Sequence, residues 1–340
     1  MSYFSASSVC GVVAALALAT AAKPLPYICY SPFRDGQIPG RDEPTDAQVQ
    51  EDLAILAPLV KGIRTYTCQG IHGRVPKLAQ AAGLEIYLGA GIGKDERNNQ
   101  NEVNALIALA KAGNPAIKGL IVGNEVLLRG DISKARLLEY IRQVKDANTG
   151  IPVTTADNYH SLKTHAADLL PAVDFVLAHV HPYWDRQPAD RGAAYVVSSW
   201  KQVQAAYPGK TVLIGETGFP TAGLSVGEAV PNEANQLRFT SDLIPLAAKE
   251  NMTFMLFISF DEQWKTNEGL VGPHWGLWKT NRQEKPAATA IRGMATGVLS
   301  WVPSRPGPPT EAWLGSDALG RLHGERGIEG RLSVWRVVRP

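Results

Sequence analysis

Short apolar segments alternate with amphipathic helical segments eight times along this chain. Each apolar segment carries almost no charge, which is typical of a strand buried on both faces of a parallel sheet. Regular alternation of such strands with helices predicts an α/β fold, and eight repeats predict one closed (β/α)8 TIM barrel. The expected strands are Pro26–Phe33, Gly62–Cys68, Leu84–Gly93, Ile117–Glu125, Ile151–Asn158, Phe175–Trp184, Thr211–Pro220 and Phe254–Glu262.

The segments between these strands have helical periodicity. In the first of them, Val49, Leu53 and Leu56 recur on one face. A doubly wound sheet is the alternative architecture, but it usually carries a glycine-rich phosphate loop after its first strand, and YSPFRDG is not such a loop. The expected helices are Asp46–Val60, Val75–Ala82, Asn101–Ala112, Ser133–Ala147, Leu162–Leu170, Ala193–Ala206, Asn232–Glu250 and a closing helix over Ala287–Val302.

Composition limits the partners of the chain. Its 340 residues are 45% hydrophobic and 19% charged, which is enough for one large core. The formal net charge is only +2 and no long run of Lys or Arg interrupts the body of the chain, so we expect no nucleic-acid partner. No cysteine–histidine spacing suggests a metal site, and no motif suggests a cofactor. We expect a monomer without a stable membrane span.

The two ends of the chain differ from its body. Residues 1–22 contain GVVAALALATAA, an apolar stretch of signal-peptide length with a small-x-small site at its end. This predicts a signal peptide or apolar leader and an exported protein, although the usual positive charges before the stretch are missing. A helix that touches a membrane is the alternative. Residues 23–302 form the expected enzymatic domain, and the Pro, Gly and Arg content of residues 303–340 predicts a loosely ordered tail.

The three cysteines do not form an obvious disulfide framework. Cys10 lies in the leader, whereas Cys29 and Cys68 fall on adjacent expected strands. A disulfide between these two is one alternative, and two buried thiols are the favoured one.

Two of the expected strands present a glutamate close behind a glycine. GLIVGNE ends at Glu125, and TVLIGETGFP contains Glu216. In a barrel both would reach the same mouth from roughly opposite sides, because they belong to strands four and seven. Two carboxyl groups about 5 to 5.5 Å apart, one protonated and one ionised, are the machinery of a retaining glycosidase, and their repulsion raises the pKa of the protonated one. The alternative is a pair of structural acids held by arginines.

Three motifs together resemble glycoside hydrolase family 17, a family of retaining (β/α)8 β-1,3-glucanases. They are VGNE, IGETGFP and FDEQWKTNEGLVGPHWGLW, and the resemblance covers about Tyr27 to Pro286. It implies that Glu125 is the acid/base and Glu216 the nucleophile. Asn124, just before the acid, could bond the sugar 2-hydroxyl.

The resemblance also implies a set of supporting residues. Tyr30 would line the cleft, and Tyr183 would orient Glu216 unless His181 does so instead. Arg64 could be an ion-pair residue of the barrel interior. Two departures stand out, because Phe219 replaces a tryptophan and ADNYH alters a sugar platform after strand five. Polar and stacking contacts with the sugar are expected from Glu262, Lys265, Glu268, Trp184, Trp264, Trp275 and Trp278.

The sequence therefore predicts a retaining glycosidase that acts on β-1,3-glucan or its oligosaccharides without a cofactor. A β-1,3-glucanosyltransferase that uses the same two glutamates is the alternative, and a non-catalytic glucan-binding protein is a third reading. Exo and endo cleavage stay open, although the short expected loops favour short chains or chain ends.

Overall fold

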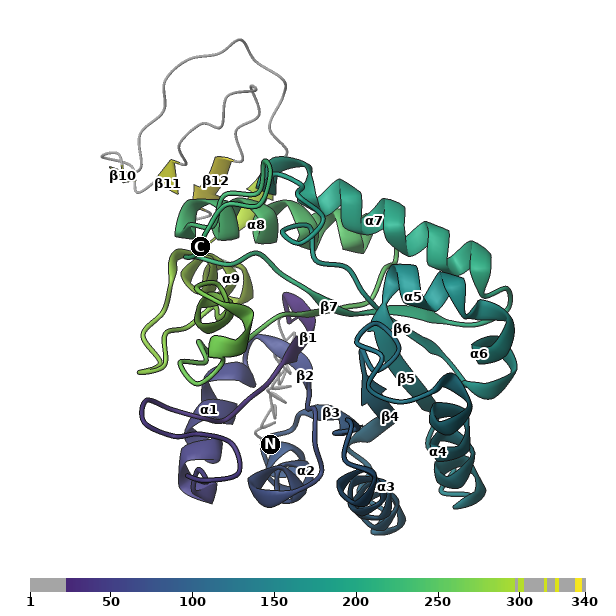
Figure 1. Cartoon of the computed structure of the whole chain (residues 1–340). Helices are drawn as coiled ribbons and strands as arrows, with labels where there is room; N and C mark the ends of the chain where they lie inside the picture. The colour runs from purple at the N-terminus through teal and green to yellow at the C-terminus, as the bar shows by residue number, and fades with distance from the viewer. Residues whose placement is uncertain (1–22, 297–298, 303–314, 317–321, 324–333, 338–340) are drawn as a thin grey trace, which may run out of the picture.

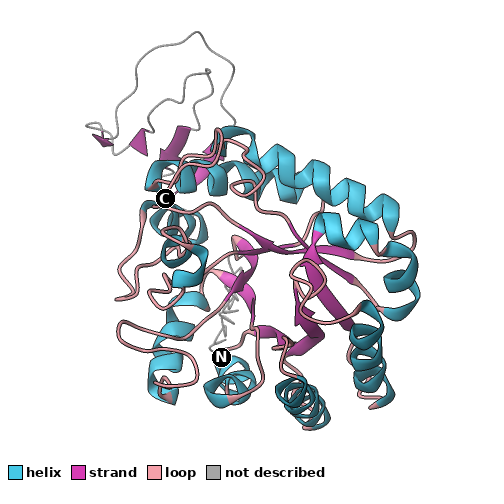
Figure 2. Ribbon diagram, in the orientation of Figure 1, coloured by secondary structure: helices cyan, strands magenta, loops and turns pink. Residues whose placement is uncertain are grey.

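Eight parallel strands close into a barrel in sequence order, with helices packed around them (Figures 1 and 2). The computed structural model describes residues 23–296, 299–302, 315–316, 322–323 and 334–337. The barrel closes because the first strand pairs in parallel with both the second and the eighth. This confirms the predicted TIM barrel. The strands are β1 Leu25–Cys29, β2 Val60–Arg64, β3 Glu85–Ala90, β4 Ile117–Asn124, β5 Val153–Asn158, β6 Val176–His179, β7 Val212–Thr217 and β8 Phe254–Leu256.

Several helices begin at a residue whose side chain caps the first turn. Thr45 and Gln48 form a reciprocal capping box at the start of the first helix. Asp95 accepts hydrogen bonds from the backbone N–H of Arg97 and Asn98, so the third helix starts before the expected Asn101. The helices are α1 Asp46–Leu56, α2 Val75–Ala81, α3 Glu96–Lys111, α4 Lys134–Asp146, α5 Tyr159–Thr164, α6 Ala166–Ala172, α7 Ala189–Ala206, α8 Glu233–Lys249 and α9 Pro286–Ala295, with short 3-10 turns η1 Gly70–Gly73, η2 Thr266–Glu268 and η3 Gly272–His274.

The predicted end of the last helix, at Val302, is wrong. Helix α9 stops at Ala295, and Leu299–Val302 forms a strand, β9, that pairs antiparallel with β12, Val334–Val337. The sequence after Thr296 is Gly followed by VLSWV, and a glycine and then β-branched and aromatic residues favour ending a helix and starting a strand. Two further short strands, β10 Gly315–Ser316 and β11 Leu322–His323, also pair. The rest of the expected tail and the leader lie outside the described residues.

Both cysteines of the barrel are buried free thiols, as predicted. Cys29 lies in β1 and its thiol donates to the carbonyl of Gly215, while that of Cys68 donates to Gly89. Burial raises the pKa of the Cys29 thiol to about 12. Cys10 lies outside the described residues. No helix in the described part of the chain is both long and apolar enough to cross a membrane.

Candidate active site

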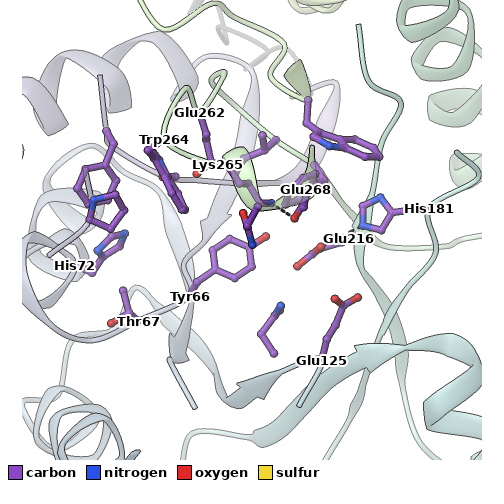
Figure 3. Close-up of a pocket in the computed structure, with 18 of the residues that line it drawn as sticks. Tyr66, Thr67, His72, Glu125, His181, Glu216, Glu262, Trp264, Lys265 and Glu268 are labelled. Atoms are coloured by element: carbon purple, nitrogen blue, oxygen red, sulfur yellow. Dashed lines mark hydrogen bonds and ion pairs between the residues drawn. The ribbon is translucent and has the colours of Figure 1, made fainter. Parts of the chain in front are cut away.

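A cavity of about 350 Å³ lies over the carboxyl ends of the strands. Its walls come from β1, β2, β4, β6, β7 and β8 or from the loops that follow them. Figure 3 shows the carboxylates of Glu125 and Glu216 directed toward one another, with His72 and Trp264 at the far end. Of the residues expected at the site, those that line the cavity are Asn124, Glu125, Glu216, Glu262, Lys265, Glu268, Trp264 and Trp275.

One imidazole ring lies between the two glutamates. His179, the last residue of β6, has Nδ1 at 3.0 Å from Oε1 of Glu125 and Nε2 at 3.5 Å from Oε1 of Glu216. Nη1 of Arg64 lies 2.9 Å from the same Nε2. Because a guanidinium can only donate, Nε2 must accept, and the proton is therefore on Nδ1 and is donated to Glu125.

Glu216 is held as a carboxylate. It belongs to β7 and is 5% exposed. Arg64 Nη1 lies 3.1 Å from its Oε1, and His181 Nε2 lies 3.1 Å from its Oε2. Burial raises the pKa of Glu216, but the neighbouring Arg64 and His181 outweigh burial and hold the pKa far below its usual range. An ionised carboxylate facing the cavity can act as a nucleophile.

Glu125 lies in a different environment. It directly follows β4, its side chain is 22% exposed, and Nη1 of Arg129 lies 3.8 Å from its Oε2. Burial raises the pKa of Glu125, and so does the charge of Glu216. His179, which donates a hydrogen bond, and the nearby His181 together lower this pKa by more than these two effects raise it, so the net pKa is below the usual value. The expected elevation by repulsion between the two acids is therefore outweighed in the free enzyme by the imidazole between them.

Asn124 is fixed by the same arginine. Its Oδ1 accepts a hydrogen bond of 2.5 Å from Nη2 of Arg64. This leaves the amide N–H groups as donors toward the cavity that Asn124 lines. Arg64 is fully buried and bonds Asn124, Glu216 and the carbonyl of Gly215 at once, as expected for an ion-pair residue of the barrel interior.

The segment after β8 supplies polar and aromatic walls. Lys265 Nζ lies 3.0 Å from Oε1 of Glu268 and 4.6 Å from the centre of the Phe257 ring. Trp275 packs edge-on against His181 and is 1% exposed. The indole N–H groups of Trp264 and Trp275 are buried and have no hydrogen-bond partner among the described residues.

Several expected contacts are not made. Contrary to expectation, Tyr30 does not line the cavity, because its side chain is fully buried and its hydroxyl lies 3.1 Å from Oδ2 of Asp52. The hydroxyl of Tyr183 donates to the carbonyl of Leu224, so His181 and not Tyr183 bonds Glu216.

The remaining aromatic residues also differ in placement. Trp184 is 46% exposed and packs on Tyr183 and Trp275 just outside the cavity wall. Trp278 is buried against Phe260 and has no surface to offer a sugar. Phe219, in the place of the family's tryptophan, is buried between Tyr183 and Phe239.

Sequence reasoning missed His179, Tyr66 and His72. A signal was present for the first two, because residues two apart on a strand share a face. His179 is two residues before His181, and Tyr66 is two residues after Arg64 in IRTY. His72 is in a 3-10 turn, where no such period applies, and burial lowers its pKa to about 4.

A model of the BtgE/BtgC glycoside hydrolase domain matches residues 27–276, most of the described barrel. The chain belongs to the BtgE/BtgC glycoside hydrolase family. The match places the acid pair and the β8 segment inside the family domain. The chain spans 40% of the length of the "Probable glucan endo-1,3-beta-glucosidase btgC" of Aspergillus fumigatus, to which it is 28% identical.

Further named relatives of this chain are two glucan glucosidases and one glucanosyltransferase. A "Glucan 1,3-beta-glucosidase" of Schizosaccharomyces pombe is 28% identical over 69% of this chain and 78% of its own length. The "Glucan endo-1,3-beta-glucosidase btgC" of Emericella nidulans is 26% identical over 78% of this chain, which spans only 45% of that protein. A solved "glycoside hydrolase family 17 beta-1,3-glucanosyltransferase" of Rhizomucor miehei has a TM-score of 0.68 and 31% identity, covering 78% of this chain and 96% of its own.

Proposed function

We propose that this glycoside hydrolase is a family 17 enzyme that cleaves β-1,3-glucan or its oligosaccharides with retention, through a covalent glycosyl-enzyme. One observation carries the proposal. Glu125 and Glu216 face one cavity from β4 and β7 and touch the same imidazole, yet only Glu216 also contacts Arg64 and His181. The buried, doubly held carboxylate suits a nucleophile, and the more exposed one suits a proton donor.

The first displacement forms the glycosyl-enzyme. Glu216 attacks the anomeric carbon, the glycosidic C–O bond breaks, and Glu125 donates its proton to the departing sugar oxygen. The pKa of Glu125 is low in the free enzyme, so this carboxylate must gain a proton as substrate binds. A bound sugar excludes water from Glu125 and so favours its protonated form.

The second displacement returns both acids to their first state. Glu125, now ionised, takes a proton from water, whose oxygen attacks the anomeric carbon while the bond to Glu216 breaks. Once Glu216 is esterified it carries no charge, and the raising effect of that charge on the pKa of Glu125 disappears. The pKa of Glu125 therefore falls, which favours the ionised form that takes the proton from water, and Glu125 donates this proton to the leaving oxygen of the next substrate.

Glucan as the substrate is supported by the names of the relatives and by the lining of the cavity. Trp264 and Trp275 line the cavity with aromatic side chains, and sugars present apolar faces that pack on aromatic rings. We propose that these two residues, with Asn124, Lys265 and Glu268, bind the sugar. We also propose export of the protein, on the strength of the apolar leader of residues 1–22.

Transglycosylation is a second candidate. The Rhizomucor miehei relative is named as a glucanosyltransferase, and Trp184 offers a half-exposed indole that packs on Trp275. A sugar acceptor stacked on Trp184 would compete with water for the glycosyl-enzyme. Products longer than the starting laminari-oligosaccharide measure this reaction directly.

The test is the stereochemistry and carboxylate dependence of turnover. We expect β-configured products first by NMR, and a loss of about 10²–10⁴-fold in kcat for Glu125→Gln and a loss at least as large for Glu216→Gln. Glu228→Gln is the matched control, because Glu228 forms only a surface ion pair with Arg191. Unchanged turnover in Glu216→Gln, or α-configured first products, would overturn the proposal.

A further inference from the structure

The backbone at Glu125 is held in an unusual conformation. Its φ is +53°, in the left-handed region that residues with a side chain rarely adopt, and Gly123 before it has φ +81°. Such a conformation persists only where the surroundings impose it. The pairing of β4 with β5 shifts register between Ile121 and Asn124, so the regular ladder alone does not fix this segment.

A buried carboxylate on β5 holds the turn that follows Glu125. Oδ2 of Asp157 accepts hydrogen bonds from the backbone N–H of Leu127 at 3.0 Å and of Leu128 at 3.4 Å. Its Oδ1 accepts from the N–H of Asn158 at 2.8 Å. Asp157 is 0% exposed and forms no ion pair within the described residues, so backbone dipoles balance its charge.

The main chain of β5 completes the arrangement. The N–H of Glu125 donates to the carbonyl of Ala156 at 2.8 Å. Ala156 and Asp157 are neighbours on β5, so one strand fixes Glu125 by its backbone and the N–H groups of Leu127 and Leu128 by a side chain. Without the Asp157 carboxylate, these two N–H groups would lose their acceptor and the turn would relax toward a commoner conformation.

We propose that Asp157 is a positioning residue that acts through the acid/base Glu125 by fixing the left-handed turn on which that side chain stands. The inference rests on the proposed function. This positioning role of Asp157 differs from a general stabilising role, because the turn controls the reach of Glu125 toward the glycosidic oxygen. A displacement of about 1 Å at such a group can cost about 10²-fold in rate.

The experiment compares two substrates that differ in their need for a proton. A laminari-oligosaccharide needs the acid to release its sugar, whereas a 2,4-dinitrophenyl β-laminaribioside has a leaving group that departs without protonation. We measure kcat/KM of Asp157→Asn on both. The matched control is Asp174→Asn, because Asp174 also accepts a backbone N–H of β5, that of Val153 at 2.8 Å, but at the opposite end of the strand.

We expect Asp157→Asn to lose about 10²-fold in kcat/KM on the oligosaccharide and to retain most of it on the aryl substrate. Azide should also raise its kcat on the aryl substrate, because azide needs no general base. Asp174→Asn should change both substrates alike. An equal loss on both substrates in Asp157→Asn, or no loss on either, would overturn the inference.

Two further variants keep the result interpretable. If Asp157→Asn fails to fold, Asp157→Glu keeps the charge but moves the carboxylate by one methylene, and the same split between substrates is expected. Glu125→Ala removes the acid itself and so gives the largest expected difference between the two substrates in their loss of kcat/KM. If the parent enzyme turns over neither substrate, the proposed function fails instead of the positioning role.

Discussion

His179 connects two groups that a retaining glycosidase must keep in different protonation states. The imidazole contacts Glu125 through Nδ1 and approaches Glu216 through Nε2, and the hydrogen bond that it donates from Nδ1 lowers the pKa of Glu125. Burial alone would raise that pKa. The ring therefore sets the upper pH limit at which Glu125 is protonated while Glu216 is ionised.

Replacing His179 should move the pH profile upward. Activity needs Glu125 protonated, so kcat/KM falls as pH rises through the pKa of Glu125, and it needs Glu216 ionised, so kcat/KM falls as pH drops through the pKa of Glu216. In His179→Leu the pKa of Glu125 rises, so the alkaline limb of the kcat/KM profile should shift to higher pH. An unshifted alkaline limb in a variant with a native unfolding midpoint would contradict this role.

At the residue scale the sequence was informative wherever a strand ended. Glu125 and Glu216 stood out because each follows a buried strand and a glycine, and the barrel brings strand ends together. Tyr30 and Tyr183 were misplaced because the direction of a side chain just beyond a strand is decided by its partners, here Asp52 and the carbonyl of Leu224. Those partners are distant in sequence and carry no local signal.

At the element scale, buried carboxylates fasten the loops around the mouth. Asp52 on α1 accepts hydrogen bonds from Arg282, in the loop between β8 and α9, and from Arg34, in the loop after β1. Glu102 on α3 accepts the N–H of Cys68 and of Gly91, and so ties the loops after β2 and β3. The loops after β1, β2 and β8, which carry cavity residues, are thereby fixed from neighbouring helices.

Removing Asp52 should destabilise the fold strongly. Asp52 is 0% exposed, and Asp52→Ala would leave the nearly buried Arg282 without its partner, which costs about 3–5 kcal/mol. Glu51→Gln is the control, since Glu51 meets the same Arg34 at the surface, where a pair is worth about 0–1 kcal/mol. Urea unfolding measures both, and similar losses in the two variants would refute the assignment.

Gly276 allows the β8 segment to fold over the cavity. A Cβ there would lie 2.2 Å from the backbone N of Asp261 and 2.4 Å from the carbonyl carbon of Phe260. Gly276→Ala should therefore shift the neighbouring Trp275, with a loss of about 1–3 kcal/mol of stability and a raised KM for oligosaccharide. Gly93→Ala, where a Cβ meets nothing within 4 Å, should change neither in thermal unfolding and steady-state assays.

Elements were predicted well where periodicity was long and poorly where it was short. The expected helix Leu162–Leu170 is two helices, α5 and α6, separated at His165. His165 ends α5 and precedes α6, which begins without a side-chain cap, so no local capping signal marks the break in the sequence. The chain after Ala295 was mistaken for helix because the strand partner of β9 lies more than thirty residues further on.

At the scale of the whole molecule, the closed sheet shields both thiols from reagents. Cys29 and Cys68 are buried against carbonyls on β7 and β3. In a Cys10→Ser protein, a thiol reagent such as DTNB should label neither in the native state and both after denaturation. A reducing agent should leave the unfolding midpoint unchanged. Fast labelling of either thiol without denaturant would contradict a closed barrel.

The barrel itself was the most predictable property, since eight strand–helix repeats leave few other ways to bury every apolar face. The cavity was less predictable because its shape depends on how the rim segments fold back, as those after the neighbouring strands β1 and β8 do where Phe33 packs against Trp264. Such contacts join β1 to β8, the first and last parts of the ring.

The rim around the mouth is uneven. Among the described residues, the side chains that line the cavity include none from the loops after β3 and β5, and these two strands flank the one that leads to Glu125. In the proposed reaction the released sugar therefore meets no cavity-lining side chain from the two loops beside the group that protonated it. Longer side chains in either loop would come nearest to Glu125, so they should change the ratio of hydrolysis to transfer.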